Sequence, residues 1–173
     1  MICQQLTRKV IDVAQDDSDE SLISTFGRLV EAESRLTRLL GARLEAAHGL
    51  PLAWFEVLLR LSRSLDGRMT MTVLAEQISL TTGGVTRLVD RMQQAGLVER
   101  RPCDTDRRVI YAAVTPRGRD RLQESSAGHA AALREVFAPL GPAGRRTLDG
   151  LLDDLRTAPS DGGPTTPHGS TAR

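Results

Sequence analysis

The sequence predicts a mainly α-helical protein that contains a winged helix-turn-helix with a two-stranded β wing, plus N- and C-terminal dimerisation helices. Three observations support this fold class. Apolar residues recur at steps of three and four over most of the chain, which is the period of amphipathic helices. One short run, RVIYAAV at 108–114, is rich in β-branched residues and follows a charged turn. The resulting order is helix, helix, helix–turn–helix, hairpin, helix, helix.

The first part of the chain predicts three helices. Between residues 21 and 48 leucines and a phenylalanine recur with helical spacing, and Gly49 ends this segment. Pro51 occupies a favourable starting position for the helix LAWFEVLLRLS. The segment SLDGRMT at 64–70 is expected to be a turn, and a short helix over about 72–79 follows it.

Residues 79–92, SLTTGGVTRLVDRM, predict the second helix of the helix-turn-helix, which closes at Gly96. Thr81 is the expected N-cap, its hydroxyl accepting a hydrogen bond from the amide of Gly83 or Gly84. The two glycines are unexpected in a first turn, because each costs about 1 kcal/mol relative to alanine. We interpret them as positions where the backbone can approach another molecule closely.

The second half of the chain predicts a hairpin and two more helices. LVERR at 97–101 and RVIYAAV are expected to pair around a charged turn at 102–107. Thr115-Pro116 has the residue types of an N-cap and a first helical position, and this helix should reach about Ala138. The last helix is predicted in GRRTLDGLLDDLR at 144–156.

Composition narrows the function classes. The chain has 173 residues, of which 40% are hydrophobic and 26% charged, as in soluble globular proteins. No apolar run is long enough to span a bilayer, and the N-terminus lacks the features of a signal peptide. Cys3 and Cys103 show neither metal-ligand nor disulfide-framework spacing, so we expect reduced thiols in a cytoplasmic protein.

Positive charge is concentrated in the middle of the chain. Between residues 60 and 121 there are twelve arginines and seven acidic residues, whereas the whole chain has a net charge of only +1. A basic middle between acidic flanks is a weak indication of a module that binds a polyanion.

The helix that begins after Thr81 has the features of a recognition helix for the DNA major groove, which is about 12 Å wide and admits one helix. Arg87 can donate two hydrogen bonds to guanine O6 and N7, and Thr82 and Thr86 can reach phosphates or a thymine methyl group. The alternative for Arg87 is a solvated charge or an ion pair with Asp90.

Arg100, Arg101, Arg107 and Arg108 cluster around the predicted hairpin. Guanidinium groups at a hairpin tip suit a narrow minor groove, whose negative potential attracts them. Asp106 is expected to orient Arg108 through a charge-assisted pair, because phosphates repel a carboxylate. The alternative is a charged turn that only favours solubility.

These segments resemble the DNA-binding core of the MarR (multiple antibiotic resistance regulator) family. The resemblance rests on LAEQ, VTRLVDRM, AGLVERRP, Asp106-Arg107-Arg108 and VTPRG over about residues 70–118, and the helix order extends it to about 22–157. It implies a homodimeric transcriptional regulator, expected to be a repressor, that binds a near-palindromic operator on double-stranded DNA. The two recognition helices would then lie about 34–36 Å apart.

The expected organisation is a flexible arm (1–20), an N-terminal dimerisation helix (21–50), the winged helix-turn-helix DNA-binding domain (51–115), C-terminal dimerisation helices (116–157) and a disordered tail (158–173). The expected DNA-binding residues are Thr81, Thr82, Gly83, Gly84, Thr86, Arg87, Arg91, Arg101, Asp106, Arg107 and Arg108. The family usually has Ser or Thr at the positions of the two glycines, so contacts of those side chains are not carried over. The sequence preference is therefore expected to differ.

No nucleophile–base pair or metal-ligand spacing is present, so we expect neither an enzyme, nor a cofactor, nor a metal site. The resemblance also makes a small aromatic or phenolic effector a candidate partner, with His48, Trp54 and Arg63 in the corresponding part of the chain. Packing of Trp54 in the core is the alternative. The alternative function is a winged-helix adaptor that docks a protein partner without binding an operator.

Overall fold

The computed structural model describes residues 19–78, 80–103, 105–106 and 108–157. The predicted arm up to residue 18, the predicted tail from residue 158 and Arg107 lie outside the described residues. The chain divides into two compact units, one up to Leu133 and the other from Arg134. Within the described ranges, no helix is both long and apolar enough to cross a membrane.

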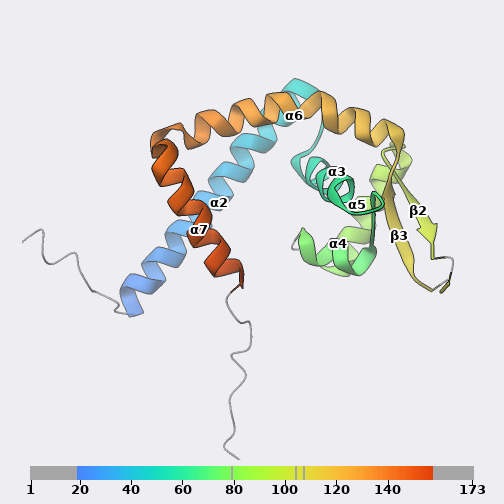
Figure 1. Ribbon diagram of the computed structural model, residues 1–173, viewed down its shortest axis with the longest axis horizontal. Helices are drawn as coiled ribbons and strands as arrows, with labels where there is room; N and C mark the ends of the chain where they lie inside the picture. The colour runs from blue at the N-terminus through green and yellow to red at the C-terminus, as the bar shows by residue number, and fades with distance from the viewer. Residues whose placement is uncertain (1–18, 79, 104, 107, 158–173) are drawn as a thin grey trace, which may run out of the picture. The chain divides into compact units, whose positions relative to one another are not determined.

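The predicted order of elements is confirmed (Figure 1). The chain forms α2 (Asp19–His48), α3 (Leu52–Arg63), β1 (Arg68–Thr70), α4 (Met71–Gln77), α5 (Thr82–Gln94), β2 (Val98–Pro102), β3 (Ile110–Val114), α6 (Pro116–Phe137), the 3₁₀ turn η1 (Ala138–Leu140) and α7 (Gly141–Thr157). The first unit thus contains the helix-turn-helix of α4 and α5 followed by the β2–β3 hairpin, which is the arrangement of a winged helix.

The core of the first unit lies between α3, the helix-turn-helix and the sheet. The apolar stripe of α5 is fully buried there, as the sequence pattern predicts, through Val85, Leu88, Val89 and Met92. The same cluster includes buried side chains of α3, α4 and β3. Because one face of α5 is fixed in this core, its opposite face is held outward in a defined orientation.

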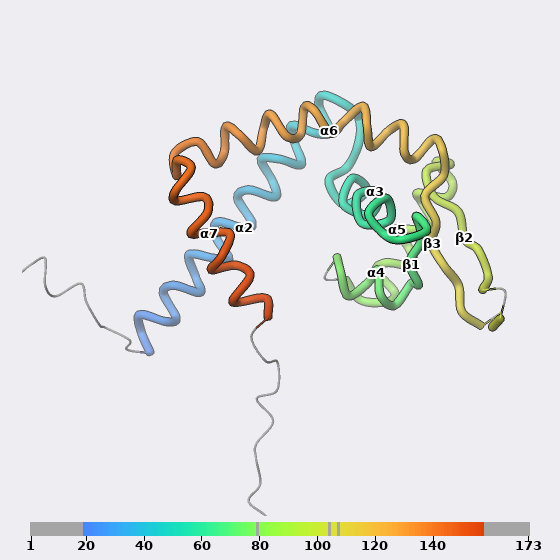
Figure 2. The backbone as a smooth tube through the Cα atoms, in the orientation of Figure 1, coloured from blue at the N-terminus to red at the C-terminus, as the bar shows by residue number. Residues whose placement is uncertain are grey.

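The sheet has three antiparallel strands in the order β1–β3–β2, so the prediction of a two-stranded wing is incomplete (Figure 2). Arg68 pairs with Ala113, and Thr70 pairs with Tyr111. The prediction of a turn over residues 64–70 is therefore wrong for the last three residues, which form β1. Gly67 does adopt the positive φ of a turn, 66°. A three-residue edge strand has too few residues to show alternation, and only its distant partner defines it.

Two other boundaries differ from the predicted ones. Strand β3 begins at Ile110 rather than Arg108, because the carboxylate of Asp106 accepts from the Arg108 amide and the Asp106 carbonyl accepts from Val109, which closes a turn there. Helix α7 begins at Gly141, since Pro142 is tolerated in a first helical turn, where no amide donor is required.

Helix α6 starts in close contact with the segment that follows α5. The Thr115 hydroxyl accepts from the Gly118 amide at 3.0 Å and donates to the carbonyl of Gly96 at 2.7 Å. Gly118 is buried, and a Cβ at this position would lie only 2.1 Å from the carbonyl oxygen of Leu97. The first turn of α6 can therefore dock here only because residue 118 has no side chain.

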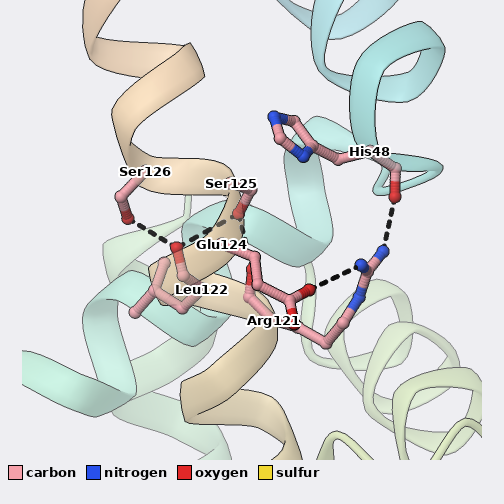
Figure 3. Close-up of polar contacts among 6 residues, drawn as sticks. All are labelled: His48, Arg121, Leu122, Glu124, Ser125 and Ser126. Carbon is pink, nitrogen blue, oxygen red and sulfur yellow. Dashed lines mark hydrogen bonds and ion pairs between the residues drawn. The ribbon is translucent and has the colours of Figure 1, made fainter.

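Arg121 attaches the end of α2 to α6 within the first unit (Figure 3). Its guanidinium group donates to the carbonyl of His48, the last residue of α2, and forms an ion pair with Glu124 at 3.0 Å. This contact supplies a positive partner for a carbonyl at a helix C-terminus, which otherwise has no intrahelical donor.

Two helices have apolar side chains that the single chain leaves exposed. Helix α2 buries only Leu40 and Leu44 near its end, whereas its exposed apolar side chains include Leu22, Ile23, Phe26, Leu29 and Val30. Helix α7, in the second unit, has no buried residue and exposes Leu151, Leu152 and Leu155. The spacing of these residues is that of one helical face in each element.

Candidate nucleic-acid interface

The start of α5 is an exposed and capped helix N-terminus. Thr81 precedes the helix in an extended conformation, and its hydroxyl accepts from the Gly84 amide at 3.1 Å. This is one of the two cap partners that the sequence predicts. Among the described residues the amides of Thr82 and Gly83 have no acceptor, so two donors at the positive end of the helix dipole remain available to an anion.

The two glycines of this first turn have different surroundings. A Cβ at Gly83 would have no atom within 4 Å, so this position is open to solvent. A Cβ at Gly84 would lie 3.2 Å from the Thr81 hydroxyl oxygen and would press on the cap. A side chain at position 84 would thus crowd the cap, whereas no described residue lies close enough to restrict a side chain at position 83.

Gly83, Arg87 and Arg91 lie on one exposed ridge of α5, because residues four apart share a helix face. Helical side chains lean toward the N-terminus, so Arg87 is directed toward the turn that contains Gly83, although no side chain lies within 4 Å of a Cβ at that glycine. Neither arginine has a hydrogen bond or ion pair to any described residue. The ion pair between Arg87 and Asp90, considered above as an alternative, is wrong: Asp90 instead pairs with Arg100 at 2.6 Å.

Thr82 and Thr86 lie one turn apart next to this ridge. The Thr86 hydroxyl donates to the carbonyl of Thr82 at 2.8 Å, so its proton is already in use. The side chain of Thr86 thus offers a methyl group and an acceptor oxygen, and no free donor, to an external partner. Thr82 is exposed and has no such side-chain bond within the described part of the chain.

The wing contains both exposed and engaged arginines. Arg108 pairs with Asp106 at 3.3 Å, as the sequence predicts, yet 93% of its side chain is exposed. Arg101 lies beside Glu99 on the same strand and pairs with it while remaining largely exposed. These two guanidinium groups are oriented by acidic neighbours and stay accessible at the surface.

Arg100 does not belong with the exposed wing arginines, contrary to the sequence-based interpretation. Its guanidinium group turns back to α5, where it pairs with Asp90 and donates to the carbonyl of Thr86 at 3.3 Å. The sequence offers only the opposite charges of the two side chains as a signal, because this contact forms between separate elements.

His48, Trp54 and Arg63 are not brought together as one site by their positions in the first unit. His48 ends α2, with its imidazole next to Gly128 of α6. Trp54 is half-buried and packs against the core, which is the alternative considered above. Arg63 is exposed at the end of α3, nine residues later. Nine residues turn a helix to roughly its opposite side and advance about 14 Å along its axis, so Trp54 and Arg63 face different ways.

Two titratable side chains have shifted pKa values. The pKa of the Cys103 thiol is lowered, first by the hydrogen bond with the Thr105 hydroxyl and then by the backbone amides of Thr105 and Asp106. Burial lowers the pKa of His129, whose ring lies 4.6 Å from that of Phe55 between ring centroids. Across the described residues, no three His, Cys, Asp or Glu side chains are grouped so as to hold a metal ion.

We expect the free energy of unfolding to fall as the pH decreases through about 6.5. The pKa of His129 is lower in the folded than in the unfolded chain, so the unfolded chain binds the proton more readily. The contribution of this residue is complete above its unfolded pKa and is lost as the pH falls toward its folded pKa. Urea unfolding at pH 7.5 and 5.5 should show a smaller pH effect for His129→Gln than for the wild type. Equal pH effects in the two proteins would contradict this assignment.

Comparison with known proteins identifies the fold. The model of the MarR family matches residues 48–109. The solved structure of Sco3205, a MarR family transcriptional regulator from Streptomyces coelicolor in complex with DNA, aligns with a TM-score of 0.74 and 27% identity, over 86% of this chain and 95% of that chain. A mutant MarR from E. coli complexed with operator DNA aligns with a TM-score of 0.69 and 26% identity, over 80% and 99% of the two chains.

The chain is thus similar to the MarR family, in sequence over residues 48–109 and in fold over most of its length. Among curated relatives from Bacillus subtilis, the HTH-type transcriptional repressor YetL is 29% identical over 110 residues, which are 64% of this chain and 66% of YetL. The HTH-type transcriptional regulator MhqR is 33% identical over 93 residues, which are 54% of this chain and 63% of MhqR. The chain thus spans slightly less than two thirds of either relative. These relatives and solved proteins are transcriptional regulators, and the chain is likewise a transcriptional regulator and not an enzyme.

Proposed function

We propose that this protein is a homodimeric, sequence-specific DNA-binding repressor that acts in the cytoplasm on a near-palindromic operator. In this proposal α5 enters the major groove, and the β2–β3 hairpin extends toward the adjacent minor groove. Thr82, Thr86 and Arg87 contact bases, while Thr81, Arg91 and the exposed wing arginines contact phosphates and groove edges.

One observation carries this proposal. The outward ridge of α5 presents Arg87 and Arg91, which have no partner among the described residues, next to two unsatisfied amides at the positive end of the helix. Two exposed guanidinium groups without a partner among the described residues, on one face of a helix of 13 residues, are free to bind phosphates or base edges. The relatives solved with DNA share this fold, which supports double-stranded DNA as the ligand.

The homodimer is supported by the apolar side chains of α2 and α7. Faces that expose several leucines in a single chain are typical of surfaces that a second copy covers. Repression is supported by the likeness to YetL, which is a transcriptional repressor. Light scattering after gel filtration should therefore give twice the mass of the 18.8 kDa chain.

A gel-shift assay with the DNA upstream of the protein's own coding sequence tests the function against the adaptor alternative. We expect a shift that survives competition by a scrambled fragment of equal length and composition, and that weakens steeply with salt, because phosphate contacts release counterions. Absence of binding even at low salt would favour the adaptor, for which the same exposed surface would dock a protein.

Gly83→Ser is expected to change which DNA sequences bind without lowering stability. The new Cβ meets no atom within 4 Å in the free protein, so any effect must come from the approach of DNA to this turn. Selection of preferred sites from a random DNA library, together with thermal unfolding, would measure both quantities. We expect an altered site preference and an unchanged or slightly higher Tm.

Two further variants make this measurement specific. Gly84→Ser should lower the Tm, because its Cβ presses on the Thr81 cap at 3.2 Å. Gln94→Ser introduces the same side chain at the exposed C-terminal end of α5 and should leave the site preference unchanged. A wild-type site preference in Gly83→Ser would mean that this glycine is merely tolerated.

A further inference from the structure

Arg100 connects the wing to the recognition helix. It lies on β2, and its guanidinium group reaches 14 residues back along the chain to α5. One terminal nitrogen pairs with the carboxylate of Asp90 at 2.6 Å, and the other donates to the carbonyl of Thr86 at 3.3 Å. Only 31% of the side chain is exposed, compared with 93% for Arg108.

Arg100 holds α5 at two points. Thr86 and Asp90 lie one turn apart on the same face, so a single guanidinium group holds two points along the helix axis. A planar fork with several donors can make both contacts together, whereas a lysine ammonium group is a point charge and cannot reproduce this arrangement. Rotation of α5 against the hairpin would break at least one of the two contacts.

The residues held in place adjoin those that the proposed function assigns to base recognition. The carbonyl bound by Arg100 belongs to Thr86, and Arg87 follows directly. Because both contacts use the positive charge of Arg100 within the protein, this guanidinium group is poorly placed to bind a phosphate. Its effect on DNA would then pass through the orientation of α5.

We propose that Arg100 is a positioning residue: it locks the recognition helix to the wing, so that α5 and the hairpin engage one DNA site in a fixed relative orientation. This inference rests on the proposed DNA-binding function. It assigns a role to an arginine of the wing that is not among the expected DNA-binding residues.

The test compares Arg100→Met with Asp90→Asn, because these substitutions break the same ion pair and change the net charge in opposite directions. For each variant, the affinity is measured for the preferred site and for random DNA by fluorescence anisotropy over a salt titration. We expect both variants to lower the ratio of the affinity for the preferred site to the affinity for random DNA. Arg100→Met should lower this ratio by roughly tenfold. Asp90→Asn should lower it by less, because Arg100 then still donates to the carbonyl of Thr86. The salt slope should fall by clearly less than one in both variants, because neither loses a phosphate contact.

Arg121→Met is the matched control. Arg121 also binds one carbonyl and one carboxylate, but these belong to His48 at the end of α2 and to Glu124 on α6, and not to α5 (Figure 3). Its loss should lower the Tm and leave the affinity ratio unchanged. An equal fall of the ratio in Arg121→Met would show that general destabilisation, and not positioning, is responsible.

Three other results would overturn the inference. If Arg100 binds a phosphate, Arg100→Met should weaken all DNA binding and reduce the salt slope by about one, while Asp90→Asn should strengthen binding. If the affinity ratio is unchanged in both variants while the wild type prefers one site, positioning by Arg100 is wrong and the proposed function stands. A wild type without any site preference would instead overturn the proposed function and the inference together.

Discussion

Arg87→Ala is expected to weaken binding to the preferred DNA site by about 1–3 kcal/mol and to reduce discrimination at one base pair. Arg87 is exposed, has no partner among the described residues and lies one turn after Gly83, where a Cβ would meet no atom within 4 Å. A guanidinium group in this setting can donate two hydrogen bonds to guanine, which alanine cannot replace. Affinities for the preferred site and for its single-base variants would measure both effects.

Random DNA serves as the internal control for Arg87→Ala. A base-reading residue should affect random DNA much less than the preferred site, whereas equal losses on both would contradict a role in base recognition. Arg145→Ala removes the same charge from an exposed position of α7, outside the winged domain. It should leave the discrimination between single-base variants unchanged.

Gly118→Ala is expected to cost about 3 kcal/mol of unfolding free energy, or roughly 6–12 °C in Tm. The added Cβ would lie 2.1 Å from the Leu97 carbonyl oxygen, 3.0 Å from a methyl group of Val114 and 3.1 Å from one of Leu58. The first of these is a backbone atom that accepts from the Thr115 amide, so it cannot move without breaking the start of α6. Thermal unfolding followed by circular dichroism would measure the loss.

Gly27→Ala is the control for the glycine substitution. Gly27 lies within α2, and a Cβ there would meet no atom within 4 Å. Because alanine favours the helical backbone by about 1 kcal/mol relative to glycine, this variant should be at least as stable as the wild type. A similar loss of stability in both variants would contradict the steric explanation for Gly118.

The elements that sequence predicts well are those whose causes are local. The burial of Val85, Leu88, Val89 and Met92 follows from helical spacing, and the cap by Thr81 follows from a threonine at the helix start. The pair of Asp106 and Arg108 joins residues two apart, so it could also be predicted. Identification of the family in the sequence relied on the combination of these local segments.

The features that escaped prediction depend on contacts between distant residues. Strand β1 exists because Arg68–Thr70 pair with β3, more than forty residues later. The redirection of Arg100 to Asp90, and of Arg121 to the end of α2, depends on how separate elements pack. Gly83 and Gly84 have the same residue type, and only their surroundings distinguish an open position from one under the Thr81 cap.

Hydroxyl-radical footprinting of the wild-type protein on its own upstream DNA tests the central claim most directly. A homodimer with one α5 per half-site predicts two protected segments related by a near-palindrome, with centres about 10–10.5 base pairs or a multiple of this apart. Protection should disappear on a scrambled fragment at the same salt concentration. Uniform protection without sequence preference, or none at low salt, would contradict sequence-specific operator binding by this protein.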